Sequence, residues 1–154
     1  MNTPGSRRTA AWIALALAVV LPACGSGGTT PSTPTRTRIA AGNFNLVGTE
    51  EAGQNGILVD IASGPFGVPN GGTVEITADW TSASNNIDIL FFLGSCVSAQ
   101  AVRGECTIAN RTSSTTAKPE RLNVIGVPAG NYSVGFANLG LTAETGSFEV
   151  FLTR

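Results

Sequence analysis

The chain has 154 residues, which is enough for one domain with a single hydrophobic core. Charged residues make up only 12% of it and glycine occurs 19 times, which excludes long amphipathic helices and favours short strands with tight turns. A net charge of −1 with scattered basic residues excludes a nucleic-acid partner, and the absence of histidine excludes Ser-His-Asp and Cys-His catalysis and most zinc sites.

The N-terminal residues have the parts of a secretory signal in the required order. Arg7 and Arg8 supply the positive region, residues 10–21 are apolar, and a small residue precedes Cys24. The apolar run is shorter than the ~20 residues that span a bilayer, which argues against the alternative of a permanent transmembrane helix. We therefore expect residues 1–23 to be a cleaved signal peptide.

The end of this segment resembles the lipobox of bacterial lipoproteins. The matching residues are Leu21, Pro22, Ala23 and Cys24. The resemblance implies that Cys24 receives a diacylglycerol before cleavage and then anchors the mature protein to a membrane. It also implies a location in the bacterial cell envelope, and Gly25 after the cysteine favours the outer membrane if the cell has one.

A segment poor in apolar residues follows the cysteine. Residues 25–38 are rich in Gly, Ser, Thr and Pro, a composition that cannot bury a core. We expect residues 24–38 to be the lipidated cysteine with a disordered tether, whose typical end-to-end distance is ~20 Å. The folded domain is then expected over residues 39–154.

Within that domain, apolar residues recur with a period of two, which indicates strands. Residues 73–80 alternate cleanly, whereas residues 87–93 are almost continuously apolar, as expected of a strand covered on both faces. The expected strands are 44–47, 57–61, 73–80, 87–93, 122–127, 132–136 and 148–152, separated by turns that include 64–72. Short strands without intervening helices predict an all-β fold, an antiparallel β-sandwich or jelly roll of about 7–8 strands.

The phase of the alternation also predicts which side chains form the core. The in-phase apolar positions are Val74, Ile76, Trp80, Ile89, Phe91, Tyr132, Val134, Phe136, Phe148 and Val150. Residues between them on the same strands, such as Thr77, are expected to face solvent.

Two segments resemble bacterial pre-peptidase C-terminal domains, which are small secreted β-sandwiches. They are residues 86–90 (NIDIL) and residues 124–134 (VIGVPAGNYSV), with the Pro-Ala-Gly-x-Tyr hairpin in the second. The resemblance covers about the last half of the chain. It implies a β-sandwich fold and gives no particular ligand.

The three cysteines fall into two groups, one in the signal segment and two in the expected folded domain. If Cys24 carries lipid, Cys96 and Cys106 remain as an even pair in the exported part, where disulfides form. Metal ligation, the alternative, lacks a partnering histidine or further cysteine. We expect a disulfide that fixes the loop between these two residues.

Oxygen-bearing side chains gather in the sequence near the end of one expected strand and the start of the next. They are Asp79, Asn85, Asn86 and Asp88, a set that could hold Ca²⁺ if backbone carbonyls and waters completed the coordination. The spacing fits no EF-hand. The alternative is that the asparagines form a turn and Asp88 bonds to neighbouring backbone.

Aromatic residues offer a second candidate site. Trp80, Phe91, Phe92 and Phe151 could form a platform that stacks on sugar rings. Trp80 is in phase with Val74 and Ile76, which favours the core. Phe92 and Phe151 are out of phase, which favours an exposed patch or a second covered face.

These features favour a non-enzymatic, membrane-anchored lipoprotein whose sandwich binds a glycan, a peptide or an envelope protein. The alternative is a structural or accessory envelope domain without a small ligand. A hydrolase that uses Asp79 and Asp88 as acid and base is a third possibility, although nothing in the sequence aligns the two around a pocket. No cofactor is expected apart from the possible Ca²⁺.

Overall fold

The structure is a computed structural model that describes residues 32–49, 58–112 and 118–154. Residues Thr33–Arg154 form one compact unit. The expected signal peptide (1–23), Cys24 and the tether as far as residue 31 lie outside the described residues. Within the described residues, no helix has the length and apolar character needed to cross a membrane.

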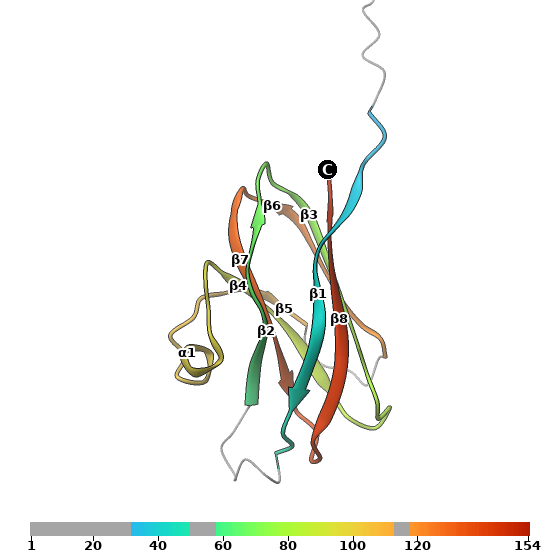
Figure 1. The fold of residues 1–154 in the computed structure, drawn as a ribbon, viewed down its shortest axis with the longest axis vertical. Helices are drawn as coiled ribbons and strands as arrows, with labels where there is room; N and C mark the ends of the chain where they lie inside the picture. Colours follow the sequence, from blue (N-terminus) through green and yellow to red (C-terminus); the bar gives the residue numbers. More distant parts are fainter. Residues whose placement is uncertain (1–31, 50–57, 113–117) are drawn as a thin grey trace, which may run out of the picture. The chain divides into compact units, whose positions relative to one another are not determined.

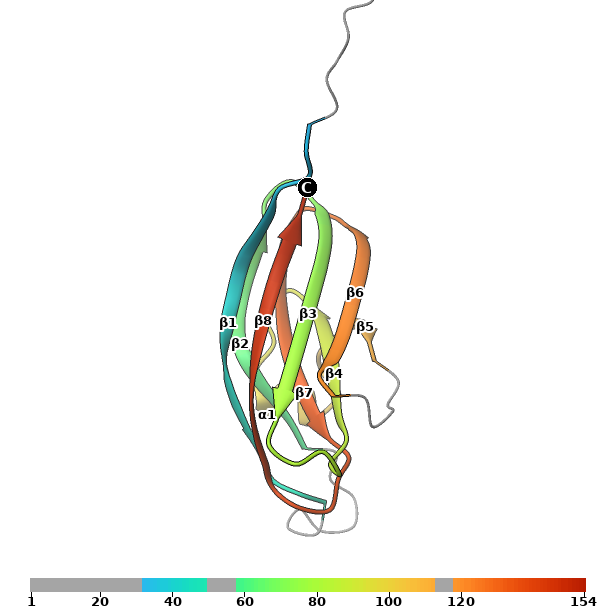
Figure 2. The same ribbon diagram turned by 90° about the vertical axis from the view of Figure 1, so that its right-hand side faces the viewer.

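Unit Thr33–Arg154 is a sandwich of two four-stranded antiparallel sheets (Figure 1). The first sheet has the order β1 (Arg36–Leu46), β8 (Glu144–Thr153), β3 (Gly72–Trp80) and β6 (Glu120–Val127), and Figure 2 shows these strands side by side. The second sheet has the order β2 (Leu58–Val68), β7 (Gly130–Asn138), β4 (Ile87–Leu93) and β5 (Ile108–Arg111). A short helix, α1 (Ser98–Val102), interrupts the connection from β4 to β5.

The strand order is that of a jelly roll. The first strand pairs with the eighth, the second with the seventh, the third with the sixth and the fourth with the fifth. Such pairing arises when one long antiparallel hairpin is rolled up, and the pairs β3–β8 and β4–β7 then join neighbouring turns of the roll. The all-β prediction, in its sandwich or jelly-roll form, is confirmed.

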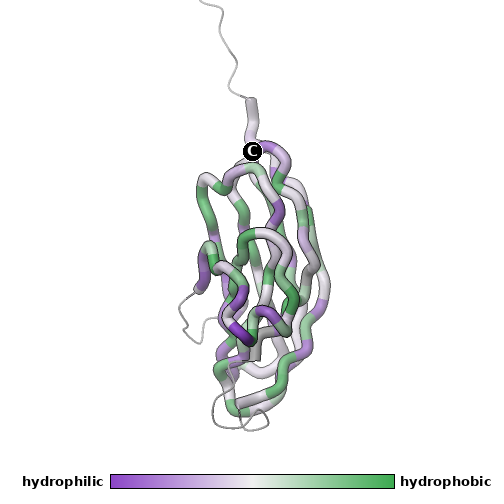
Figure 3. Tube along the Cα trace, turned by 90° about the vertical axis from the view of Figure 1, so that its left-hand side faces the viewer, coloured by the Kyte–Doolittle hydropathy of each residue, from purple (hydrophilic) through white to green (hydrophobic). Residues whose placement is uncertain are grey.

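The core lies between the two sheets and follows the period-two pattern of the sequence. All ten in-phase positions expected in the core are buried. Phe44 of the first sheet stacks on Phe136 of the second, with 4.5 Å between ring centroids. Within the second sheet, Phe91 stacks on Tyr132 at 4.8 Å. Figure 3 shows the alternation of apolar and polar positions along the strands that produces this layer.

A second, smaller apolar cluster lies on the outer face of the second sheet. Leu90 and Phe92 point there and pack with Cys96 and Ala137 beneath the α1 segment. Phe92 is only 2% exposed, so the second covered face expected for it is confirmed. This cover explains why β4 is apolar on both faces.

Four elements differ from the sequence prediction. The segment 64–72 was expected to be a turn, but β2 continues through it to Val68. An edge strand tolerates the glycines and Pro65 there, because one side of its backbone is not paired in the sheet. Similarly, β1 already begins at Arg36, inside the expected tether, since an outward-facing strand end can pair without apolar residues. The short elements β5 and α1 have no strong periodic signal and were not predicted.

Candidate functional site

An open groove of about 800 Å³ lies at one end of the first sheet. This volume is within the range usual for small-molecule sites. We call it the polar groove. It is lined by Asn43, Phe44, Asn45, Asp60, Asp79, Trp80, Thr81, Thr145, Gly146 and Ser147.

Strand register brings these residues together from three neighbouring strands. In the β1–β8 ladder, Asn43 stands opposite Ser147 and Asn45 opposite Thr145. In the β3–β8 ladder, Asp79 stands opposite the same Ser147. Because side chains alternate between faces, these polar groups point outward while their neighbours Phe44 and Trp80 point into the core.

The intervening residue of β8 is Gly146, and its lack of a side chain has a structural cause. Gly146 pairs with Phe44 on one side and with Trp80 on the other. A Cβ at this position would overlap the ring of Phe44 and the carbonyl oxygen of Asp79. The glycine therefore leaves room for the Phe44 ring beneath the groove.

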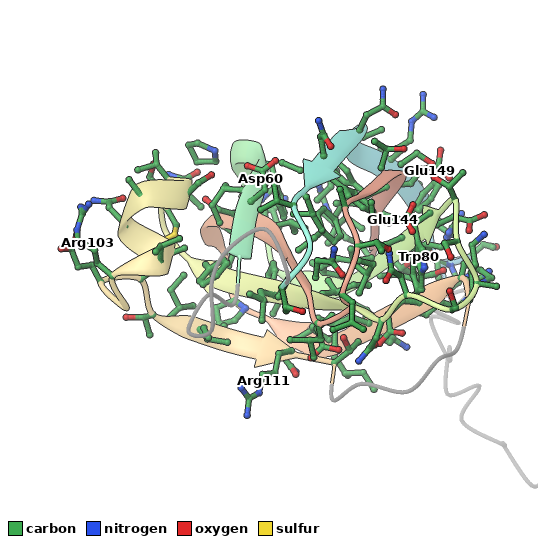
Figure 4. All side chains as sticks on the ribbon, turned by 90° about the horizontal axis from the view of Figure 1, so that it is seen from below. Asp60, Trp80, Arg103, Arg111, Glu144 and Glu149 are labelled. Carbon is green, nitrogen blue, oxygen red and sulfur yellow. A yellow bond between two sulfur atoms is a disulfide. The ribbon has the colours of Figure 1, made fainter. Side chains whose placement is uncertain are left out.

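The acids of the groove differ in their surroundings. Asp79 accepts a hydrogen bond from the backbone N–H of Trp80 at 2.9 Å and lies 3.4 Å from Lys118 Nζ. Asp60 reaches the groove from β2, at the edge of the second sheet. Its Oδ1 accepts a hydrogen bond at 3.0 Å from the hydroxyl of Ser98, the first residue of α1. In Figure 4, Asp60 lies on the side of the molecule that carries α1, and Trp80 lies toward the opposite side.

A buried polar network fixes the loop beside the groove. The Glu144 carboxylate accepts hydrogen bonds from the backbone N–H groups of Thr81 and Ser82 at 3.0 and 3.1 Å. The side-chain amide of Asn85 adds a third at 2.9 Å. Burial alone would raise the pKa of Glu144, but the hydrogen bonds from Thr81, Asn85 and Ser82 together hold it below its usual value.

A second buried acid lies on the opposite edge of the first sheet. Glu120 is 6% exposed, and within the described residues its Oε2 has no hydrogen-bond partner. Burial raises the pKa of Glu120, a hydrogen bond from Thr112 opposes that shift, and the nearby charge of Asp88 adds to it. The negative charge of Asp88 therefore acts on the pKa of Glu120, a residue that the sequence analysis had not placed near Asp88.

The four expected calcium ligands have separate environments. Asp79 pairs with Lys118, whereas Asn85 is buried and donates to Glu144 and to the carbonyl of Thr142. Asn86 and Asp88 lie at the start of β4. Across the described ranges no group of three or more acidic, cysteine or histidine side chains could hold a metal ion. The calcium site stays a prediction that the local contacts do not strengthen.

The aromatic residues do not form an exposed platform. Trp80, Phe91 and Phe92 are 3%, 1% and 2% exposed, so a stacking role for them at the surface is wrong. The apolar phase of β3 and the α1 cover of β4 explain their burial. Phe151 is half-buried, and the guanidinium of Arg36 lies 3.3 Å from its ring centroid.

The disulfide between Cys96 and Cys106 is present and confirms the sequence prediction. It closes the segment that carries α1, and a buried serine holds the start of that segment. Ser133 Oγ accepts from the N–H of Cys96 at 3.1 Å and donates to the carbonyl of Gly94 at 2.9 Å. The α1 segment is thus fixed at several points on the second sheet.

Sequence reasoning missed most of the polar groove. Its outward residues Asn43, Asn45, Thr145 and Ser147 were not singled out. The alternation of Asn43 and Asn45 with the apolar Phe44 and Leu46 was the available signal, because it marks one polar face of a strand.

Comparisons with known proteins add little to this geometry. No family model matches the chain, and no curated protein matches it significantly. Among solved structures, the Yersinia pseudotuberculosis-derived mitogen aligns with 78% of this chain and 84% of its own, at 10% identity and a TM-score of 0.38. A similarity of this degree carries no inference about function.

Proposed function

We propose that the protein is an exported, lipid-anchored lipoprotein of the bacterial envelope whose β-sandwich binds a glycan in the polar groove without catalysing a reaction. The anchor is the lipid on Cys24, and its support is the order of Arg7, Arg8, the apolar run and the lipobox-like residues.

The observation that carries the proposal is the position of the groove within the sandwich. The strand β1 begins at Arg36, where the chain enters the domain, and this end lies beside the C-terminus (Figure 1). Thr35 and Arg154 are joined there by two backbone hydrogen bonds of 2.9 and 3.1 Å. The groove residues Asn43 and Asn45 lie near the other end of the same strand. A domain held at its β1 start thus presents the groove at its far end.

The chemistry of the groove suits a polyhydroxylated ligand. Two side-chain amides, from Asn43 and Asn45, offer both donors and acceptors. The hydroxyls of Thr81, Thr145 and Ser147 do the same with adjustable geometry. No lysine or arginine is among the described lining residues, so the groove does not favour an anionic ligand.

Binding of envelope glycans to the full chain in detergent tests this proposal. An array of bacterial cell-wall and surface polysaccharides identifies the ligand, and calorimetry measures its affinity. The double variant Asn43→Ala/Asn45→Ala should weaken binding at least about tenfold, since each lost hydrogen bond is worth ~1 kcal/mol. The control is Asn123→Ala, an exposed position of β6 outside the groove, which should bind as the unchanged protein does.

Three outcomes would contradict the proposal. Binding that is equal in both variants would place the ligand elsewhere. Binding of envelope peptides or proteins with no glycan on the array retained would favour the protein-binding alternative, and the absence of any ligand would favour an accessory structural role.

A further inference from the structure

Asp60, at the rim of the polar groove, forms no salt bridge with any residue that the structure describes. The second acid of the groove, Asp79, has Lys118 beside it. Asp60 is also half-buried, so water compensates its charge less than that of a fully exposed acid.

The position of Asp60 is fixed before any ligand arrives. Ser98 Oγ donates to Asp60 Oδ1 at 3.0 Å and accepts the backbone N–H of Ile61 at 2.9 Å. Ser98 lies on α1, which the Cys96–Cys106 disulfide and Ser133 hold against the second sheet. The Ser98 hydroxyl thus orients the carboxylate, and a carboxylate can accept about four hydrogen bonds in all.

We propose that Asp60 binds an ammonium group of the ligand, so that the polar groove prefers glycans that carry free amino groups. Ser98 is a positioning residue for this contact. The inference rests on the proposed glycan-binding function and adds the charge of the ligand to it. A charge-assisted hydrogen bond from an ammonium group to a held carboxylate is about twice as strong as a neutral one, which supplies the selectivity.

Matched oligosaccharides of one backbone and length test the inference. Oligomers of β-1,4-linked glucosamine carry ammonium groups, and the N-acetylated oligomers carry neutral amides at the same positions. Calorimetry on the full chain in a non-ionic detergent, at about pH 6, compares the two probes under conditions in which the glucosamine amines are protonated. The glucosamine probe should bind on the order of tenfold more tightly than the acetylated probe.

Three variants separate the charge from the scaffold. Asp60→Asn should remove the preference for the amine, so that the ratio of the two affinities falls to about one. Ser98→Ala should reduce the preference by about threefold, and this ratio is a readout that simple destabilisation of α1 would not move. Glu149→Gln, a matched removal of one exposed acid outside the groove, should leave the preference intact.

The outcomes distinguish this inference from the function on which it rests. Equal binding of the two probes, or an unchanged preference in Asp60→Asn, would overturn the role of Asp60 while glycan binding stands. Retention of neither probe, together with no glycan retained on the array, would overturn both.

Discussion

Asn85 and Glu144 form a buried pair in which the side-chain amide of Asn85 donates to Glu144 Oε2 at 2.9 Å. The two residues are 3% and 4% exposed. Since Glu144 also accepts from two backbone N–H groups of the β3–β4 loop, one carboxylate determines the conformation of the chain next to the polar groove.

Replacement Glu144→Gln should therefore destabilise the domain by about 2 to 3 kcal/mol. The glutamine amide would turn a donor toward other donors and leave buried N–H groups unpaired. Urea unfolding at neutral pH measures the loss. Glu149→Gln, on the same strand but exposed and ion-paired with Arg38, should cost under ~0.5 kcal/mol. Equal costs for the two variants would show that the Glu144 network is not a structural requirement.

Gly146→Ala should be poorly tolerated, because the new methyl group would overlap the ring of Phe44 and the backbone of β3. Overpacking of this kind costs roughly 1 to 3 kcal/mol. The matched control is Gly64→Ala on β2, where a Cβ has nothing within 4 Å and should change stability little. Thermal unfolding compares the variants, and a stable Gly146→Ala protein would contradict the close packing beneath the groove.

Trp80→Ala should cost ~3 to 5 kcal/mol as a large-to-small change in the core. Thr77→Ala, on the opposite face of β3, should cost under ~0.5 kcal/mol, since this outward-facing side chain makes a long hydrogen bond of 3.4 Å with Arg121 and is not part of the core. Denaturant unfolding of both variants tests the phase of the strand. A mild effect of Trp80→Ala would indicate that the Trp80 side chain lies at the surface.

The raised pKa of Glu120 predicts a pH dependence of stability. Glu120 binds its proton more tightly in the folded state than in the unfolded state, where the pKa of a glutamate is ~4.3. The contribution of Glu120 is thus fully present below about pH 4.3 and declines as pH rises through the raised folded value. Relative to the unchanged protein, Glu120→Gln should gain stability between about pH 4 and neutral pH. Urea unfolding across this range is the measurement, and parallel pH profiles for the two proteins would refute the assignment.

Cys24→Ser should abolish incorporation of labelled fatty acid and release the protein from the membrane. An inhibitor of the lipoprotein signal peptidase should instead cause a larger, uncleaved form to accumulate. Fractionation and gel mobility measure both effects. Unchanged membrane association of the Cys24→Ser protein would contradict the lipid-anchor proposal.

The sequence was informative wherever the structure depends on local alternation. The alternating spacing of Val74, Ile76 and Trp80 was enough to predict that they are buried. The nearly continuous apolar composition of β4 was enough to predict that both of its faces are covered. The cysteine pair was predictable by elimination, because only two cysteines remain once Cys24 is assigned to lipid.

The polar groove was not predictable in this way, since its residues meet only through the register of distant strands. Asn43 and Ser147 are opposite each other because the first and last strands of the roll pair, and no local pattern encodes that pairing. The contact between Asp60 and Ser98 likewise depends on how α1 folds back over the second sheet. Short elements such as α1 and β5 present too few residues for periodicity to reveal them.

The ladder between β1 and β8 has a mechanical consequence under the proposal that the domain is anchored at the start of β1 and binds its ligand in the polar groove. The two strands pair from Arg36 with Thr153 to Leu46 with Glu144, over nearly the whole length of β1. Antiparallel hydrogen bonds lie perpendicular to the strands, so tension between the start of β1 and a ligand in the groove pulls across these bonds in shear. Under shear the bonds share the force and must break together, whereas a force that peeled β1 from its end would break them one by one. The roll therefore places its most extensively paired edge strand along the line of tension.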